Sequence, residues 1–223
     1  NFSFLDIGGN DGTLAKFMFE KGFKSYVIDP SPAINYCPEE IITINDYLNI
    51  NSAKEIKKKN GSFKFISTNN CMANIRDLHS FAKAISYLLE DDGILVVETG
   101  NIRTQLNSKT AEMLNHEHYH YFSINSLNYL FKDYGISFFD ALDINNKGGS
   151  IRYIGKKTRK DIANSNKSKL TEELPLFFGN EIESFSNYYK DRIIYLQNLI
   201  KDKKVVGFGA SGGTTILTYV LKL

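Results

Sequence analysis

The chain has 223 residues, of which 42% are hydrophobic and 23% charged, enough for one complete domain and part of another. Its net charge of +2, without a broad basic block, does not favour nucleic acid as a partner. No stretch reaches the roughly 20 apolar residues of a membrane span, and Cys37 and Cys71 form no metal-binding spacing. We therefore expect a reduced, cytoplasmic protein without a membrane partner.

Short apolar runs alternate with helical patterns along the first part of the chain. The runs with the length and β-rich composition of strands are residues 2–8, 25–30, 40–45, 63–68 and 93–100. Apolar residues recur at helical spacing over 14–21 and 76–89, and the lysines at 57–59 are interpreted as the end of another helix. Strands that alternate with helices predict a mostly parallel, Rossmann-like sheet covered on both faces.

Three further elements complete this predicted domain. Ser123 is placed to cap a helix that runs to about residue 134, and two strand-like runs, 136–144 and 148–157, come next. Because these two runs are consecutive, we expect them to be antiparallel and to finish the sheet. Residues 1–157 are therefore predicted to form one α/β domain with an antiparallel end.

The last part of the chain predicts the start of a second domain. Residues 158–175 are rich in Lys, Asn and Ser and are interpreted as a linker. Residues 176–223 contain a long helical pattern, from about 185 to 201, and then a strand, a glycine turn and a helix; the turn holds Gly207, Gly209 and Gly212. The chain opens on a strand-like run and closes on a helical pattern without a stop signal, so we expect a fragment of a longer protein.

The stretch FLDIGGNDGTL predicts a strand, a tight glycine turn and a helix, with Asp29 at the end of the next strand. A dinucleotide-binding turn would receive a pyrophosphate, which the carboxylates of Asp6 and Asp11 would repel. The same carboxylates suit the sulfonium and the ammonium group of S-adenosylmethionine, so this cofactor is favoured over a nicotinamide. A purely structural turn remains the alternative. The cofactor-binding candidates are Asp6, Gly8, Gly9, Asn10, Asp11, Gly12, Asp29, Pro30, Asp46 and Asn69.

One of these candidates has an equally good second interpretation. Asp46 follows the third predicted strand, where its carboxylate could accept from the adenine amino group. The same residue type in the same place often forms an Asx turn with its own backbone.

Residues 114–123 read LNHEHYHYFS and contain three of the four histidines of the chain. On an extended strand His116, His118 and His120 would share one face, as zinc ligands do. No cysteine or suitably placed acidic fourth ligand lies nearby, so a metal is not predicted. Acid/base chemistry or substrate contact is favoured, and histidines hydrogen-bonded to neighbouring loops remain the alternative.

Further substrate-binding candidates lie at strand ends. Glu98 ends a strand at the edge where such sheets bind ligands. Gly149 and Ser150 precede the last strand and would let backbone approach a substrate, and Arg152 would meet a diphosphate. An ordinary strand-end carboxylate and a tight hairpin turn with a surface arginine are equally consistent with these positions.

Six stretches resemble, in order and spacing, the sugar C-methyltransferases, which use S-adenosylmethionine on nucleotide-linked 4-keto deoxysugars. They are LDIGGNDGTL, VIDPS, STNNCMANIRDLHSF, NHEHYHYFSINSLNYLF, NKGGSIRYIG and VVGFGASGGTTIL. The resemblance covers nearly the whole chain and implies a class I methyltransferase domain over 1–157. It also implies that a small zinc domain precedes this chain and that most of a C-terminal α/β domain follows it, so zinc is expected only in the missing N-terminal part.

The resemblance implies roles for single residues. The family segment that matches 115–118 usually reads Tyr-His-Glu-His, and its last histidine is implicated as the base, which makes His118 the candidate here, with Glu117 orienting it or holding a sugar hydroxyl. Asn70 or Asn115 would donate to the enolate oxygen, and His116 and Asn74 would contact substrate. The leading prediction is carbon methylation of a nucleotide-linked keto sugar.

This chain departs from the family at two positions of the presumed sugar site. Asn115 replaces a tyrosine and Asn74 replaces a histidine. These departures make oxygen methylation of a related sugar the nearer alternative. A degenerate, non-catalytic domain that binds a nucleotide sugar is the other. No sequence pattern indicates an oligomeric state.

Overall fold

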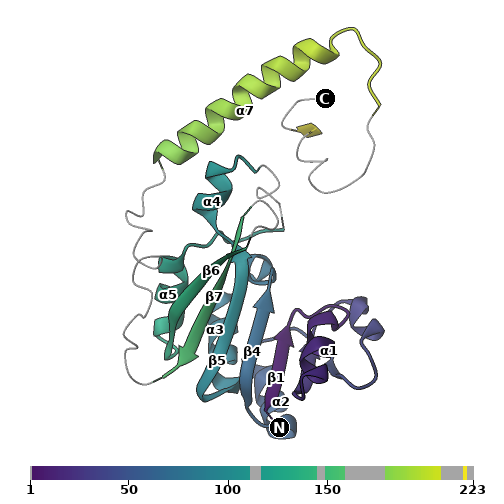
Figure 1. Cartoon of the computed structure of the whole chain (residues 1–223), viewed down its shortest axis with the longest axis vertical. Coiled ribbons are helices and arrows are strands. Elements are labelled where there is room, and N and C mark those ends of the chain that lie inside the picture. Colours follow the sequence, from purple (N-terminus) through teal and green to yellow (C-terminus); the bar gives the residue numbers. More distant parts are fainter. Residues whose placement is uncertain (1, 111–116, 145–148, 159–178, 207–217, 220–223) are drawn as a thin grey trace.

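A computed structural model describes residues 2–110, 117–144, 149–158, 179–206 and 218–219. Its centre is a seven-stranded sheet of order β3-β2-β1-β4-β5-β7-β6 (Figure 1). The strands are β1 Ser3–Ile7, β2 Lys24–Ile28, β3 Ile42–Ile44, β4 Phe63–Asn69, β5 Leu89–Gly100, β6 Ile136–Ile144 and β7 Ser150–Lys157. Neighbours from β3 to β5 pair in parallel, whereas β7 is antiparallel to both β5 and β6. The predicted Rossmann-like sheet with an antiparallel end is confirmed.

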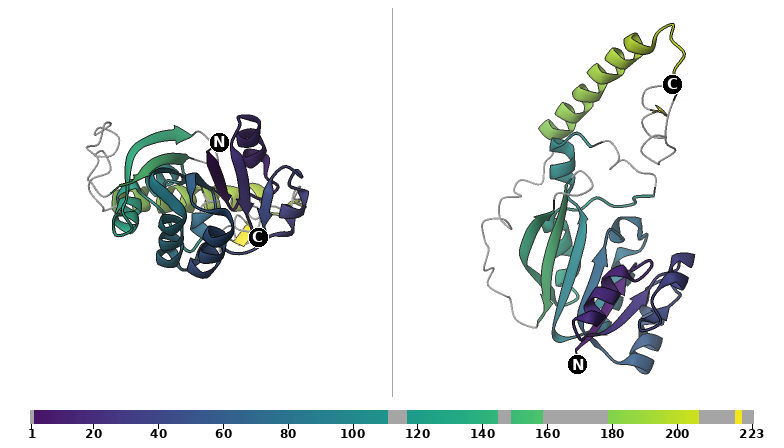
Figure 2. Two further views of the ribbon diagram at one scale, coloured as in Figure 1. Left: turned by 90° about the horizontal axis from the view of Figure 1, so that it is seen from below. Right: turned by 45° about the vertical axis from the view of Figure 1, so that its right-hand side comes forward.

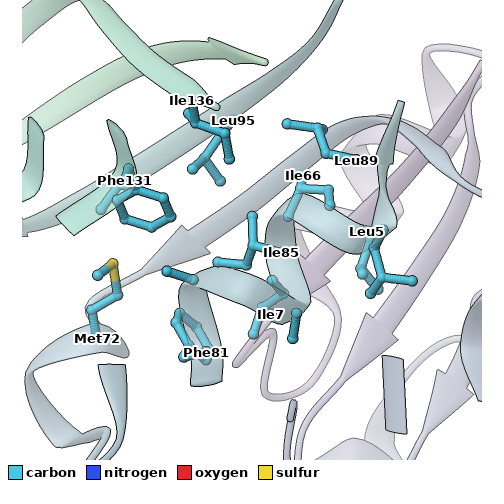
Figure 3. Close-up of a cluster of buried hydrophobic side chains, with 14 of the residues drawn as sticks. Leu5, Ile7, Ile66, Met72, Phe81, Ile85, Leu89, Leu95, Phe131 and Ile136 are labelled. Atoms are coloured by element: carbon cyan, nitrogen blue, oxygen red, sulfur yellow. The ribbon is translucent and has the colours of Figure 1, made fainter. Parts of the chain in front are cut away.

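Helices cover the two faces of the sheet unequally. Helix α1 Thr13–Glu20 and the short 3₁₀ helix η1 Pro32–Tyr36 pack a small core against β1 and β2 on one face. Helices α2 Ile50–Asn60, α3 Leu78–Leu88 and α5 Ile124–Lys132 pack the large core on the opposite face. Figure 3 shows part of this large core, with Ile66, Ile85, Leu95 and Phe131 directed toward one another.

Alternation along the strands decides which side chains enter the large core. Val97 of β5 and Tyr153 of β7 are fully buried there, so their neighbours in sequence face the other side of the sheet. On that other side Ile94, Val96 and Ile154 remain partly exposed. No helix of the described residues lies over this half of the face (Figures 1 and 2).

Side chains cap the starts of three helices, and the sequence predicted one of these caps, Ser123. The Ser123 side chain accepts from the Ser126 backbone N–H and the Ser126 side chain accepts in return, so Ser123 caps α5 as predicted. Asn49 caps α2 in the same way, and the lysines at 57–59 lie in its last turn, as expected. Asp77 caps α3.

Two boundaries lie more than two residues from their predicted positions, and one short helix is not apparent from the sequence. Strand β5 begins at Leu89 rather than at 93, because Leu89 pairs with Phe63 across a register shift. Helix α4 Ile102–Asn107, capped by Asn101, was not predicted because six residues are too few to show a helical period. Helix α7 Gly179–Ile200 begins before the predicted residue 185, because its first turn is mostly polar and no residue of α7 is buried.

Helix α7 contacts the rest of the fold through α4 and the residues just after it. Lys109 Nζ donates to Ser184 Oγ at 2.8 Å, and the Tyr189 hydroxyl donates to the Lys109 carbonyl at 2.6 Å. The predicted linker, apart from residue 158, and the second glycine turn at 207–212 lie outside the described residues. Among the helices that are described, none has the length and apolar character of a membrane span.

Candidate cofactor and acceptor site

Polar side chains form a band along the carboxyl edge of the sheet, on the face that carries α1. Register places Asp6 of β1 opposite Ser67 of β4, and Asn69 of β4 opposite Glu98 of β5. Glu98 is in turn opposite Arg152 of β7. Residues directly opposite each other point to the same face of the sheet. The band therefore crosses β1, β4, β5 and β7 on one face, near the carboxyl ends of the parallel strands. We call the part at β1 and β2 the cofactor half, and the part formed by Asn69, Glu98 and Arg152 the acceptor half. Asn69 was predicted to bind the cofactor, but its register places it beside Glu98.

The glycine turn after β1 lies in close contact with neighbouring side chains. Gly8 and Gly12 have φ values of 71° and 76°, which favour glycine. A Cβ atom on Gly8 would lie 2.9 Å from Cys71 Sγ, and one on Gly12 would lie 2.8 Å from Cys37 Sγ. A Cβ on Gly9 would lie 3.0 Å from the Asp6 carboxylate. The glycines are therefore required for packing, and they bring bare backbone to the edge where a cofactor would bind.

Asp29 joins this turn to the segment after β2. Its Oδ2 accepts from the Asn10 backbone N–H at 2.9 Å, and its Oδ1 accepts from the Ser31 N–H at 2.8 Å, across Pro30. The Ser31 hydroxyl is buried and has no hydrogen-bond partner among the described residues. A buried hydroxyl without a partner beside an anchored carboxylate fits a site for the hydroxyls of a ribose.

Asp6 is the most perturbed acid of the site. Its side chain is only 3% exposed, and Ser67 Oγ donates to its Oδ1 at 2.5 Å. Burial raises the pKa of Asp6 to about 6; the charge of Asp29 adds to this rise and the Ser67 hydrogen bond opposes it. No Lys or Arg of the described residues pairs with Asp6. A buried carboxylate without a protein counter-ion favours a cationic ligand, so the residues present fit S-adenosylmethionine.

The other two acidic candidates are exposed and bonded locally. Asp11 Oδ1 accepts from the Thr13 N–H at 3.2 Å and from its hydroxyl at 2.8 Å, and these bonds lower the pKa of Asp11. Asp46 Oδ1 accepts from the N–H of the next residue, Tyr47, at 2.7 Å, whereas an Asx turn would bond the residue after that. Cofactor contact by Asp11 and Asp46 stays a prediction.

The histidine segment lies against the chain that follows β4. The Tyr119 N–H donates to the Ala73 carbonyl at 2.8 Å, and His120 Nε2 is 3.4 Å from the Arg76 carbonyl oxygen. Because Cys71, which begins this stretch of chain, packs on Gly8, residues 71–76 link the glycine turn to the histidine segment. His118 is half-buried, and its ring meets the edge of Tyr121 at a centroid distance of 6.2 Å.

The remaining predicted catalytic residues are placed as follows. Asn70 is exposed at φ 51°, and its backbone N–H donates to the Glu98 carbonyl at 2.8 Å. Glu117 and Asn74 are also exposed, whereas Asn115 and His116 lie outside the described residues. In the described part of the chain no three His, Cys, Asp or Glu side chains form a group that could hold a metal ion.

Glu98 and Arg152 form an ion pair across β5 and β7. Arg152 Nε and Nη2 lie 3.0 and 2.7 Å from the same carboxylate oxygen, Oε2. The Glu98 side chain is 8% exposed and that of Arg152 is 43% exposed. The sequence predicts both residues as separate substrate-binding candidates but carries no signal for their pairing, because they are 54 residues apart.

The residues just before β7 pack against α4. The Asn101 N–H donates to the Gly149 carbonyl at 3.3 Å, and Asn101 Nδ2 donates to the Tyr153 hydroxyl at 3.2 Å. Gly149 has φ 113°, and a Cβ there would collide with Thr104 of α4. Ser150 is buried. Packing against α4 is therefore a sufficient reason for the Gly149 turn. The sequence carries no local signal for the bond between Asn101 and Tyr153, which are 52 residues apart.

Comparison with known proteins places the chain among methyltransferases. A family described as a methyltransferase domain matches residues 2–138. The C-methyltransferase NovU of Streptomyces niveus is 27% identical over 149 residues, which cover 66% of this chain and 36% of that protein. The chain therefore matches only about a third of the length of that relative.

Solved structures agree in fold at low identity. An S-adenosylmethionine-dependent methyltransferase from Archaeoglobus fulgidus has a TM-score of 0.56 and 15% identity, covering 70% of this chain and 86% of its own. A TehB-like S-adenosylmethionine-dependent methyltransferase from Corynebacterium glutamicum has a TM-score of 0.53 and 15% identity, covering 70% and 80%. A Burkholderia thailandensis N1-methyltransferase with bound S-adenosylhomocysteine has a TM-score of 0.52 and 15% identity, covering 70% and 71%.

Proposed function

The chain belongs to the methyltransferase domain family and has the class I fold of S-adenosylmethionine-dependent methyltransferases, and from this premise we propose a specific reaction. The protein transfers a methyl group from S-adenosylmethionine to a carbon atom of a nucleotide-linked keto sugar. The observation that carries the proposal is the link from the glycine turn, through Cys71 and Ala73, to the segment that holds His118. The name of the relative NovU supports carbon as the methylated atom.

The cofactor half has the chemistry that the methyl donor requires. S-adenosylmethionine, when bound, supplies a methyl group that is already activated on a sulfonium. Asp29 and the buried Ser31 hydroxyl would hold the ribose, and Asp6 would balance the positive charge of the ligand. The glycine turn lets the ligand approach the backbone closely.

His118 acts on the acceptor as the general base. Its imidazole would take the proton from the carbon beside the ketone. The electron pair left behind would form the new carbon–methyl bond as the sulfur–methyl bond breaks, with S-adenosylhomocysteine as the leaving group. Histidine suits this task because it takes up and releases protons near neutral pH. Asn70 and Asn115 would donate to the oxygen of the transient enolate, and Glu117 would orient the imidazole. Holding the acceptor beside the activated methyl group supplies much of the remaining rate enhancement.

Proton exchange tests the carbon assignment separately from methyl transfer. The full-length protein is incubated in deuterium oxide with S-adenosylhomocysteine and a nucleotide-linked 4-keto-6-deoxy sugar, and deuterium at the α-carbon is followed by NMR. We expect exchange that is fast with the wild type, slow with His118→Ala and unchanged with His79→Gln, since His79 bonds Tyr134 on another surface. Methyl transfer to the sugar without exchange would show oxygen methylation and refute the carbon assignment.

A further inference from the structure

The Glu98–Arg152 pair has an incomplete geometry for a purely structural ion pair. An arginine that clamps a carboxylate in the usual fork donates to both oxygens. Here both contacts from Arg152 go to Oε2, and no described residue donates a hydrogen bond to Glu98 Oε1. The Glu98 side chain is nevertheless 92% buried, since only 8% of it is exposed. Oε1 is not among the described buried polar atoms that lack a partner, so this oxygen reaches the surface of an otherwise buried side chain and is open to a ligand that donates a hydrogen bond to it.

The surroundings of this pair extend it into a row. Asn69 is directly opposite Glu98 on the parallel strand β4, and Arg152 is directly opposite it on β7. The three side chains therefore present an amide, a carboxylate and a guanidinium side by side on one face. This is the half of the face that no described helix covers (Figures 1 and 2). Two positions back along β4, Ser67 already bonds Asp6 in the cofactor half.

The open groups of the row are complementary to neighbouring hydroxyls. Glu98 Oε1 can only accept a hydrogen bond, whereas the remaining N–H groups of the half-exposed Arg152 can only donate. A vicinal diol matches this arrangement, because one hydroxyl donates to the carboxylate while the neighbouring oxygen accepts from the guanidinium. Asn69 offers both an oxygen and an NH₂ group beside them.

We propose that Asn69, Glu98 and Arg152 form the acceptor subsite of the enzyme and select acceptors that carry a vicinal diol. This inference rests on the proposed function, because it takes the acceptor to be a sugar, and it adds which feature of the sugar is read. Glu98 is the specificity-determining residue, and Arg152 both orients it and completes the contact.

Calorimetry with two acceptors tests the subsite. Full-length protein saturated with S-adenosylhomocysteine is titrated with a nucleotide-linked 4-keto-6-deoxy sugar that retains its 2,3-diol, and then with the 2-deoxy analogue. We expect the wild type to bind the diol form at least about tenfold more tightly, the scale of a hydrogen bond to a buried charge.

Glu98→Gln is the decisive variant. Its carbonyl oxygen can still accept from Arg152, while an NH₂ donor replaces the open Oε1 acceptor. We expect the diol form to bind about tenfold more weakly and the deoxy form to be little affected. Lys156→Gln is the matched control, since it removes the 2.9 Å ion pair to Asp92 between the same two strands at their opposite end. It should leave the preference for the diol intact.

Each other outcome contradicts the subsite. Equal wild-type affinity for both sugars, with methyl transfer to both, would refute diol selection and leave the proposed function standing. Equal weakening of both sugars by Glu98→Gln, with a lower midpoint of thermal unfolding, would make the pair a structural bond between β5 and β7. Tight binding of the nucleoside diphosphate alone that Arg152→Gln abolishes would place a diphosphate there. Binding of neither sugar, with intact S-adenosylhomocysteine binding, would remove the sugar acceptor and the subsite together.

Discussion

The cofactor half and the acceptor half lie on one face of one sheet, yet they are built in different ways. The cofactor half consists of a turn and carboxylates from β1 and β2, closed in by α1 and held at backbone level by Asp29. The acceptor half consists of side chains from β4, β5 and β7, together with a histidine segment that joins Ala73 through its own backbone. Backbone bonds and close packing hold the first, whereas the second consists of side chains on a part of the face that no described helix covers. If the two halves bind methyl donor and acceptor as proposed, substitutions in the acceptor half should leave methyl-donor binding intact.

The largest effect is expected from a substitution in the glycine turn of the cofactor half. Gly8→Ala introduces a Cβ at a φ of 71° and at 2.9 Å from Cys71 Sγ, so the turn must move. We expect the free energy of unfolding to fall by about 2–4 kcal/mol and S-adenosylhomocysteine binding to be lost. Denaturant unfolding and calorimetry measure the two effects.

Gly22→Ala separates strain from collision in that experiment. Gly22 has a φ of 89°, but nothing lies within 4 Å of a Cβ placed there. We expect it to cost only about 1 kcal/mol, from backbone strain, and to leave cofactor binding intact. If the two variants lose equal stability, the contact with Cys71 is not what fixes the turn.

The next effect is on the acceptor side alone. His118→Ala should lower the rate of methyl transfer about a hundredfold, the usual scale for loss of a general base. Affinity for S-adenosylhomocysteine should not change, because the variant keeps the backbone bonds from Tyr119 and His120 to the Ala73 carbonyl. Single-turnover rates and calorimetry on the same preparation check this. A parallel loss of cofactor affinity would show that the two halves are not independent.

Asp6 gives the cofactor half a pH dependence of predictable sign. Its pKa is raised from 3.8 to about 6 in the folded protein, so between these values the folded chain holds a proton that the unfolded chain has released. The free energy of unfolding therefore falls as pH rises through this window, by on the order of 2–3 kcal/mol in total, and levels off above pH 6.

Cofactor affinity should run in the opposite direction. A cationic ligand favours ionised Asp6, so S-adenosylmethionine should bind more weakly below pH 6 and should release protons when it binds near that pH. Calorimetry in buffers of different ionisation enthalpy counts these protons. Asp6→Asn should abolish both pH dependences, and Asp11→Asn, which changes an exposed carboxylate, should preserve them. Retention of the proton release in Asp6→Asn would assign it to another group.

The difference between the two halves also explains how far the sequence could be interpreted. The strands, the antiparallel end, the Ser123 cap and the glycine turn depend on patterns within about ten residues, and the structure confirms them. Glu98 and Arg152 are 54 residues apart in the sequence, and His120 and Arg76 are 44 apart. No local sequence pattern can predict contacts at these separations. The packing of Gly149 against Thr104 of α4 was not predicted either, because α4 itself shows no helical period in the sequence. Whether His118 acts as the base stays a prediction.

The smallest expected effect is that of a substitution beneath the acceptor half, and it tests whether packing against α4 positions that half. Tyr153→Phe removes the hydroxyl that accepts from Asn101 Nδ2 at 3.2 Å, beneath the corner where Gly149 meets α4. We expect a loss of about 1 kcal/mol in unfolding free energy, because a buried amide loses one partner. The ring stays in the large core, so the sheet and the cofactor half should be unaffected. A rise in KM for the acceptor with an unchanged affinity for S-adenosylhomocysteine would show that α4 positions the acceptor half. An unchanged KM would mean that Asn101 and Tyr153 only stabilise the fold. The orientation of the Arg152 side chain would then depend on its ion pair with Glu98 and not on α4.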